Sequence, residues 1–114
     1  MEGKPVVLST VEGIVGFDWD EWNVEKIWLK HHVAPAECEQ ALFHRPLIIE
    51  TDKEHSEVES RYYALSQTDA GRRLFIVLTV RHEKLRVISA RAMSRRERRA
   101  YERATKEEQG GSGV

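Results

Sequence analysis

The sequence contains a single cysteine, Cys38, so a disulfide within the chain is impossible. Long hydrophobic runs are also missing, because the most apolar stretch, residues 74–80, is far too short to cross a bilayer. The first residues lack the basic and then apolar form of a secretion signal. These absences lead us to expect a cytoplasmic protein that neither spans a membrane nor binds one.

Cys38 also lacks the setting of a reactive thiol. It lies at helical spacing from Ala41 and Leu42 and is flanked by Glu37 and Glu39. A nucleophilic thiolate needs electropositive surroundings, which these neighbours do not supply. We therefore interpret Cys38 as a small core residue.

Net charge is nearly absent, at −1 over 114 residues, but the charges are unevenly distributed. The first 60 residues contain 13 acidic and 5 basic residues, whereas the remaining 54 contain 6 acidic and 13 basic residues. Of the 12 arginines, all but Arg45 lie at or after position 61. Such an asymmetry predicts a polyanionic partner for the C-terminal half, unless the acidic half packs against it instead.

The length fits one domain, and 40% hydrophobic with 32% charged residues is typical of a globular chain. Periodicity predicts a strand at 14–19, helices at 21–31 and 34–43, strands from 47 and at 61–67, 73–81 and 85–92, and a last helix from 94 to about 106. Ser94 and Glu97 form a capping box for that helix. We expect an extension at 1–13, one domain at 14–107 and a flexible tail at 108–114. This order predicts an α+β fold, an antiparallel β-sheet with two N-terminal helices and one C-terminal helix.

Arginines recur on three of the expected strands and on the last helix. The strand arginines are Arg61, Arg81, Arg86 and Arg91. Strict alternation along the last strand would place Arg86 and Arg91 on opposite faces of the sheet. Guanidinium groups bind phosphate oxygens with paired hydrogen bonds, so we expect RNA to bind here.

The last helix adds a second basic surface, because Arg95, Arg98 and Arg99 share a face by their spacing. Three tyrosines offer surfaces on which unpaired bases could stack: Tyr62, Tyr63 and Tyr101. The alternative is that this helix face is merely solvated, or that it pairs with the acidic half.

The polar segment at 55–61 carries the groups that RNA cleavage requires. A base must remove the 2′-hydroxyl proton, an acid must protonate the departing 5′-oxygen, and a cation must stabilise the phosphorane. Histidine is a side-chain type that titrates near neutral pH, so His55 is a candidate for proton transfer. Glu59 could act as the base if burial raises its pKa, and Arg61 could bind the phosphate. The alternative is an exposed polar turn that leads into a strand.

Lys30, His31 and His32 form a cationic cluster at the end of the first expected helix. The two histidines are turned about 100° apart on a helix, so they do not face a common metal. We expect neither a metal site nor a cofactor. Lys30 and His31 are candidates for RNA contact, although the helix dipole alone favours cations at this end.

Several of these segments resemble the BrnT toxin family: residues 17–20, 29–33, 55–65 and, most closely, 87–102. The resemblance covers about residues 14–104. It implies a ribonuclease toxin with a RelE-like fold and a BrnA-type antitoxin that has a ribbon-helix-helix DNA-binding part. Operator DNA would be reached only indirectly, through the antitoxin.

Two positions depart from the family pattern. His32 and Ser66 stand where glycine is usual, and the glycine before Val33 would end the helix in a left-handed turn. A histidine in that conformation costs about 1 kcal/mol. Neither departure involves the candidate catalytic groups directly.

Two hypotheses remain. The first is a metal-independent endoribonuclease with Arg61, Arg81 and Arg91 on the phosphate, and Glu59 or His55 as base or acid. Lys30, His31, Arg86 and the last helix would then bind RNA. The second is a non-catalytic module, or a degenerate toxin, whose basic face binds an antitoxin or nucleic acid without chemistry.

Overall fold

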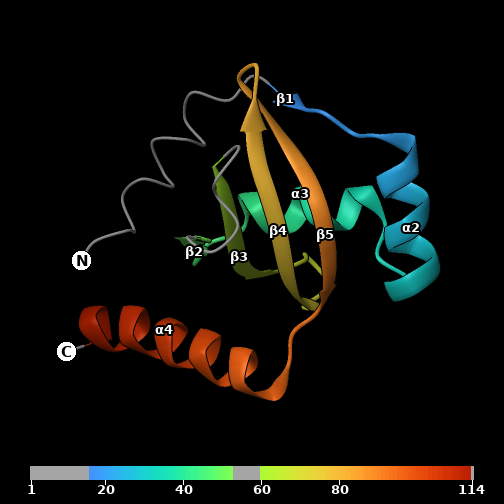
Figure 1. Cartoon of the computed structure of the whole chain (residues 1–114). Helices are drawn as coiled ribbons and strands as arrows, with labels where there is room; N and C mark the ends of the chain where they lie inside the picture. Colours follow the sequence, from blue (N-terminus) through green and yellow to red (C-terminus); the bar gives the residue numbers. More distant parts are fainter. Residues whose placement is uncertain (1–15, 53–59, 114) are drawn as a thin grey trace.

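The computed structural model describes residues 16–52 and 60–113, with side chains up to residue 106 (Figure 1). The order of elements is β1 (Gly16–Phe17), α2 (Glu21–His31), α3 (Pro35–Phe43), β2 (Ile48–Thr51), β3 (Arg61–Gln67), β4 (Arg73–Arg81), β5 (Lys84–Ala92) and α4 (Arg95–Gly113). The α+β prediction is confirmed. The expected extension at 1–13 lies outside the described residues.

The sheet has the strand order β1-β5-β4-β3-β2. Strands β2 to β5 are antiparallel, as expected for consecutive strands joined by short connections. β1 differs, because it pairs in parallel with β5 at the sheet edge. No hairpin joins these two strands, so the antiparallel constraint of a tight turn does not apply to them.

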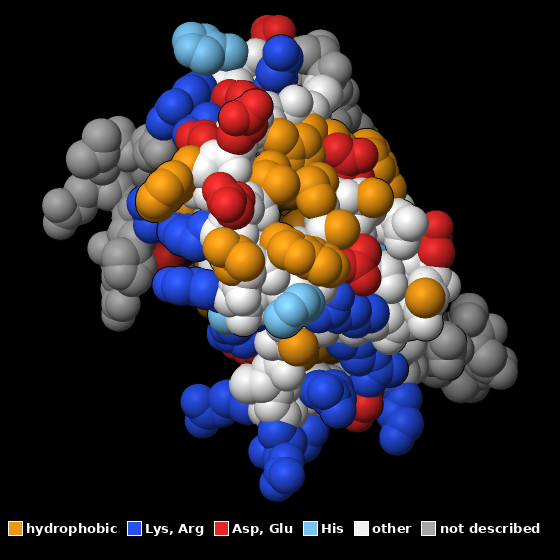
Figure 2. Space-filling view, turned by 90° about the vertical axis from the view of Figure 1, so that its right-hand side faces the viewer, with side chains coloured by type: hydrophobic (Ala, Val, Ile, Leu, Met, Phe, Trp, Pro, Cys, Tyr) orange, Lys and Arg blue, Asp and Glu red, His pale blue; other side chains and the backbone are white. Residues whose placement is uncertain are grey.

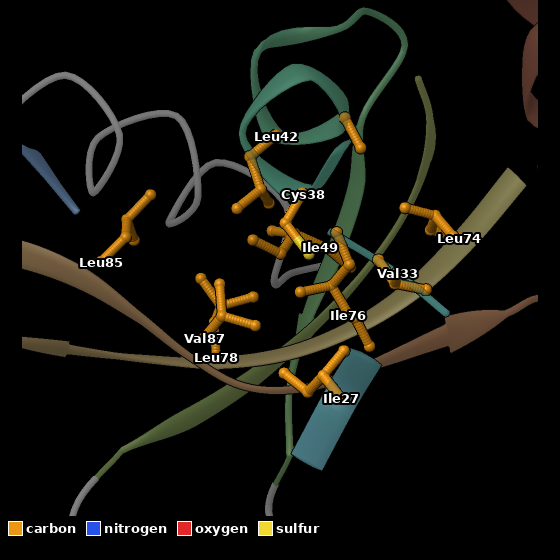
Figure 3. Packing of buried hydrophobic residues seen from close by; sticks show 13 residues of the cluster. Ile27, Val33, Cys38, Leu42, Ile49, Leu74, Ile76, Leu78, Leu85 and Val87 are labelled. Atoms are coloured by element: carbon orange, nitrogen blue, oxygen red, sulfur yellow. The ribbon is translucent and has the colours of Figure 1, made fainter. Parts of the chain in front are cut away.

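Helices α2 and α3 pack against one face of the sheet, which we call the core face. Its buried strand residues are Ile49, Ala64, Leu74, Ile76, Leu78, Leu85, Val87 and Ala90. Ile27 from α2 and Leu42 from α3 point toward them (Figure 3). Cys38 is fully buried in this cluster, and desolvation by burial raises the pKa of its thiol to about 12. Its interpretation as a core residue is confirmed.

The opposite face of the sheet is covered at one end by α4. Tyr101 of α4 is buried together with Leu65 and Met93, and Ile48 and Phe75 pack against this second cluster. The Tyr101 hydroxyl donates to the carbonyl of Pro46 over 2.9 Å. Tyr101 is therefore a structural anchor, so its expected use as a stacking surface for RNA bases is wrong.

One prediction about β5 is also wrong, because the strand contains a β-bulge. Val77 pairs with Ser89 and the next residue of β4, Leu78, pairs with Val87, which leaves Ile88 as the extra residue. A bulge reverses the alternation of side chains beyond it. Arg86 and Arg91 consequently lie on the same face of the sheet.

The helix ends follow local signals in the sequence. Asp20 accepts the N–H of Trp22 over 2.8 Å at the start of α2, and Ser94 and Glu97 form the expected capping box of α4. His32 adopts the left-handed conformation predicted for the glycine position, with φ 55°. The other departure, Ser66, is buried, and its hydroxyl has no hydrogen-bond partner among the described residues. α4 extends to Gly113, beyond the expected end near Lys106.

Candidate nucleic-acid interface

The four strand arginines gather on the sheet face opposite α2 and α3, which we call the arginine face. Arg61 of β3 and Arg86 of β5 both pair with Thr79 of β4, so the three residues form one cross-strand row. Arg81 lies two residues beyond Thr79 on the same face. Arg91 pairs with Phe75, four residues before Thr79. The register with β4 places Arg61 and Arg81 on this face, and the bulge brings Arg86 and Arg91 together on it.

Two of these arginines connect the sheet to other elements. Arg86 pairs with Asp18 at 3.4 Å and with Asp20 at 2.9 Å, and its side chain is only 20% exposed. Hydrogen bonds from the Trp22 N–H and from Arg86 lower the pKa of Asp20, although partial desolvation opposes them. Arg86 therefore fixes the start of α2 against β5.

Arg91 fixes α4 against the sheet in a similar way. Its guanidinium makes two hydrogen bonds of 2.9 Å to the Glu97 carboxylate, and its Cζ lies 4.1 Å from the centre of the Phe75 ring. The hydrogen bonds from Arg91 hold the pKa of Glu97 below its ordinary value. The predicted catalytic Arg91 is thus a fixed cation between the sheet and α4.

Two further arginines bridge elements, and the sequence interpretation had given them no role. Arg72 donates to the carbonyls of His31 and His32, at 3.1 and 2.8 Å, and pairs with Glu37. It thereby binds the end of α2 to the start of α3. Arg73 pairs with Glu102 of α4. We call this set the bridging arginines: Arg72, Arg73, Arg86 and Arg91. The alternative that the acidic half packs against the basic half is confirmed for Arg72 and Arg86.

The arginines of α4 behave differently. All five are exposed, and their side chains form no ion pair or hydrogen bond with another residue in the described ranges. We call them the α4 arginines: Arg95, Arg96, Arg98, Arg99 and Arg103. Figure 2 shows Lys and Arg side chains concentrated at the lower end of the molecule, where α4 lies. This surface offers guanidinium groups directly to a phosphate backbone.

Glu50 and Tyr63 form a further pair on the arginine face that the sequence did not reveal. They are cross-strand partners, and the Tyr63 hydroxyl donates to the Glu50 carboxylate over 2.6 Å. This hydrogen bond raises the pKa of Tyr63 to about 12. The Tyr63 ring also stacks on Phe75 at 5.6 Å. The pairing of Glu50 with Tyr63 follows from the register between β2 and β3, which the sequence alone does not give. Tyr62, by contrast, packs against the core.

Two of the remaining candidates, Lys30 and His31, lie away from this surface. His55 and Glu59 lie outside the described residues. Lys30 is exposed and His31 half-buried at the end of α2, which packs on the core side of the sheet. In residues 16–52 and 60–113, no three His, Cys, Asp or Glu side chains lie together as metal ligands would. No helix in the part of the chain that the structure describes could cross a membrane.

The fold and the arginine face define a small α+β protein with a cationic sheet surface and a basic terminal helix. The family described as ribonuclease toxin, BrnT, of type II toxin-antitoxin systems matches residues 19–97, and the chain belongs to that family. Membership implies an RNA substrate and an antitoxin partner. No curated protein matches the chain significantly. The family match ends at Glu97, so Arg98, Arg99 and Arg103 lie beyond it.

Proposed function

We propose that this chain is an endoribonuclease toxin that cleaves RNA without a metal ion, using the arginine face to bind the scissile phosphate. The observation that carries this proposal is the convergence of Arg61, Arg81, Arg86 and Arg91 on one sheet face, where the bulge at Ile88 brings Arg86 and Arg91 together. A BrnA-type ribbon-helix-helix antitoxin neutralises the toxin in the cytoplasm and provides contact with operator DNA.

Arg61 and Arg81 are the proposed phosphate ligands, and Arg91 stabilises negative charge from a fixed position. Charge that builds up on a phosphorane is best stabilised by donors that are already oriented. The ion pair with Glu97 and the Phe75 ring hold Arg91 in one orientation before RNA binds. This fixed geometry supports its assignment.

The proton-transfer groups are proposed from three candidates. Glu59 and His55 are the candidates from the sequence, and Glu50 joins them because its carboxylate lies on the arginine face. Tyr63 orients that carboxylate through a hydrogen bond in which its hydroxyl is the donor. Glu50 is therefore a candidate general base for the 2′-hydroxyl.

The second candidate function is a non-catalytic module or a degenerate toxin. The specific observation in its favour is that Arg86 and Arg91 are both engaged by carboxylates of the same chain. Such ion pairs stabilise the fold whether or not the protein acts on RNA. On this alternative, the basic surfaces bind an antitoxin or nucleic acid only.

Cleavage of a single-stranded RNA by the purified protein, with and without EDTA, tests the proposal. We expect cleavage to persist in EDTA and to fall by at least about 100-fold in an Arg61→Ala, Arg81→Ala double variant, since these cations act on the transition state. Arg45→Ala, which removes an exposed arginine outside the arginine face, is the matched control and should cleave normally. Loss of cleavage in EDTA would remove the metal-free mechanism. If the wild-type protein is folded but cleaves no RNA, the result would favour the second candidate function, a non-catalytic module.

A further inference from the structure

Helix α2 exposes large hydrophobic side chains that the described part of the chain leaves largely uncovered. Trp22 is 71% exposed, Leu29 is 68% exposed and Trp28 is 48% exposed. Trp22 and Leu29 are seven residues apart, so they lie on one side of the helix, away from the buried Ile27. We call these three residues the α2 patch. Tryptophan is enriched in the energetically dominant positions of protein interfaces, and clustered exposure of this kind marks a binding surface.

Charge changes sign along this helix. Glu21 and Glu25 lie in its first half, and Lys30 and His31 lie in its last turn. Figure 2 shows hydrophobic side chains, with acidic ones among them, across the face where α2 lies, and Lys and Arg side chains below them. The basic last turn of α2 therefore faces the lower end of the molecule, where Lys and Arg side chains are concentrated and α4 lies (Figures 1 and 2). A complementary partner would place apolar side chains on the α2 patch. Acidic residues would follow at the end of the partner that lies near α4.

We propose that the α2 patch is the docking site for the antitoxin, through an apolar segment that continues into an acidic stretch bound by the α4 arginines. This inference rests on the proposed function, because it takes the partner to be an antitoxin that neutralises an RNA-cleaving toxin. An antitoxin bound in this way occupies the cations that would otherwise hold RNA. Neutralisation then operates by competition for the α4 arginines, without insertion into the arginine face.

The test measures binding of the protein encoded by the reading frame next to this one, by titration calorimetry. We expect a Trp22→Ser, Leu29→Ser variant to bind at least about 30-fold more weakly, the loss that removal of an interface hot spot produces. Both side chains are mostly exposed, so the fold should tolerate the change. Trp28 is left intact because it packs against the His32 ring at 5.2 Å.

Phe43→Leu is the matched control, because Phe43 is 63% exposed but lies at the end of α3 and outside the α2 patch, and leucine keeps an apolar contact with the Phe17 ring. Phe43→Ser is the harsher version of the same control. Both should bind as tightly as the wild type. An Arg95→Glu, Arg98→Glu variant should lose at least about tenfold in affinity through charge repulsion, and more at low salt than at high salt. Equal weakening by Phe43→Leu, or wild-type binding by the Trp22→Ser, Leu29→Ser variant, would overturn the proposal.

RNA cleavage is measured on the same variants, so that the two proposals fail separately. The Trp22→Ser, Leu29→Ser variant should cleave RNA at the wild-type rate although its affinity for the partner is reduced. If the wild type binds the partner through the α2 patch but cleaves no RNA, the docking site stands and the ribonuclease assignment falls. Sedimentation of the chain alone tests the remaining possibility, which is that the chain forms a dimer through the α2 patch. A dimer abolished by the same variant would assign the α2 patch to a second copy and overturn the antitoxin assignment.

Discussion

The bridging arginines and the α4 arginines are equally basic but occupy different environments. Each bridging arginine joins the sheet, or the turn that precedes β4, to another element through a carboxylate, as in the pairs Arg72–Glu37 and Arg86–Asp20. The α4 arginines extend from an exposed helix surface without a carboxylate partner in the described residues. The net charge of the C-terminal half therefore overstates the cationic surface available to RNA.

The two sets of arginines should therefore affect different properties: the bridging arginines affect the stability of the fold, and the α4 arginines affect the binding of RNA. A guanidinium that fixes a helix against a sheet affects the free energy of unfolding, whereas an exposed one affects affinity for a polyanion and its dependence on salt. Arg61 and Arg81 form a third group, on the arginine face, where we place the chemistry.

The largest effect on RNA affinity is expected from removing three α4 arginines together, as Arg95→Ala, Arg98→Ala, Arg99→Ala. If each contacts one phosphate of single-stranded RNA, affinity at 0.15 M salt should fall by about 50-fold, and the slope of log K against log salt should drop by about 2. Fluorescence anisotropy over a series of salt concentrations measures both quantities. An unchanged slope would show that these arginines do not contact the phosphate backbone.

The next largest effect concerns a bridging arginine. Arg72→Ala should lower the free energy of unfolding by about 2 kcal/mol, because it leaves the terminal carbonyls of α2 and the Glu37 carboxylate without their donor. Urea denaturation measures the change. The comparison variant, Arg95→Ala, should stay within about 0.5 kcal/mol of wild type, as exposed substitutions do. If Arg72→Ala and Arg95→Ala destabilised the protein equally, the bridging arginines and the α4 arginines would not differ in their contribution to stability.

A pH-dependent effect follows from Glu97. Its pKa is lower in the folded protein than the unfolded value of about 4.3, so its ionised form stabilises the fold above that pH. This stability is lost as pH falls through the folded pKa. Glu97→Gln should therefore be about 1 kcal/mol less stable than wild type at pH 7, and the difference should shrink below pH of about 4. A difference that stays constant down to pH 3 would contradict the assigned role of the ion pair with Arg91.

The smallest effect is expected at the end of α2. His32→Gly should raise the free energy of unfolding by about 0.5 kcal/mol, because glycine adopts the left-handed conformation without strain but loses the contact with the Trp28 ring. Thermal denaturation measures the shift. Destabilisation would show that the ring contact outweighs the backbone strain.

Most of the fold could be predicted from the sequence, since the local signals agree with one another. Ser94 caps its helix as predicted, and the apolar period of residues 73–81 matches β4. The parallel pairing of β1 with β5 could not be predicted, because it joins segments that no short turn connects.

The composition of the site was harder to predict. The bulge at Ile88 has no local signal, yet it decides that Arg86 and Arg91 share a face. The Glu50–Tyr63 pair depends on a register that is set across the segment between β2 and β3. Carboxylate partners of Arg72 and Arg86 lie 35 and 66 residues away along the chain. Contacts of such separation depend on topology rather than on local propensity.

Single-turnover RNA cleavage over a range of protein concentrations tests the separation between chemistry and binding most directly. The Arg61→Ala, Arg81→Ala variant should lower the maximal rate constant by at least about 100-fold and change the half-saturating concentration little. The Arg95→Ala, Arg98→Ala, Arg99→Ala variant should raise the half-saturating concentration and keep the maximal rate constant. If both variants change the same parameter to a similar extent, the arginine face and the α4 arginines do not have the separate roles assigned to them.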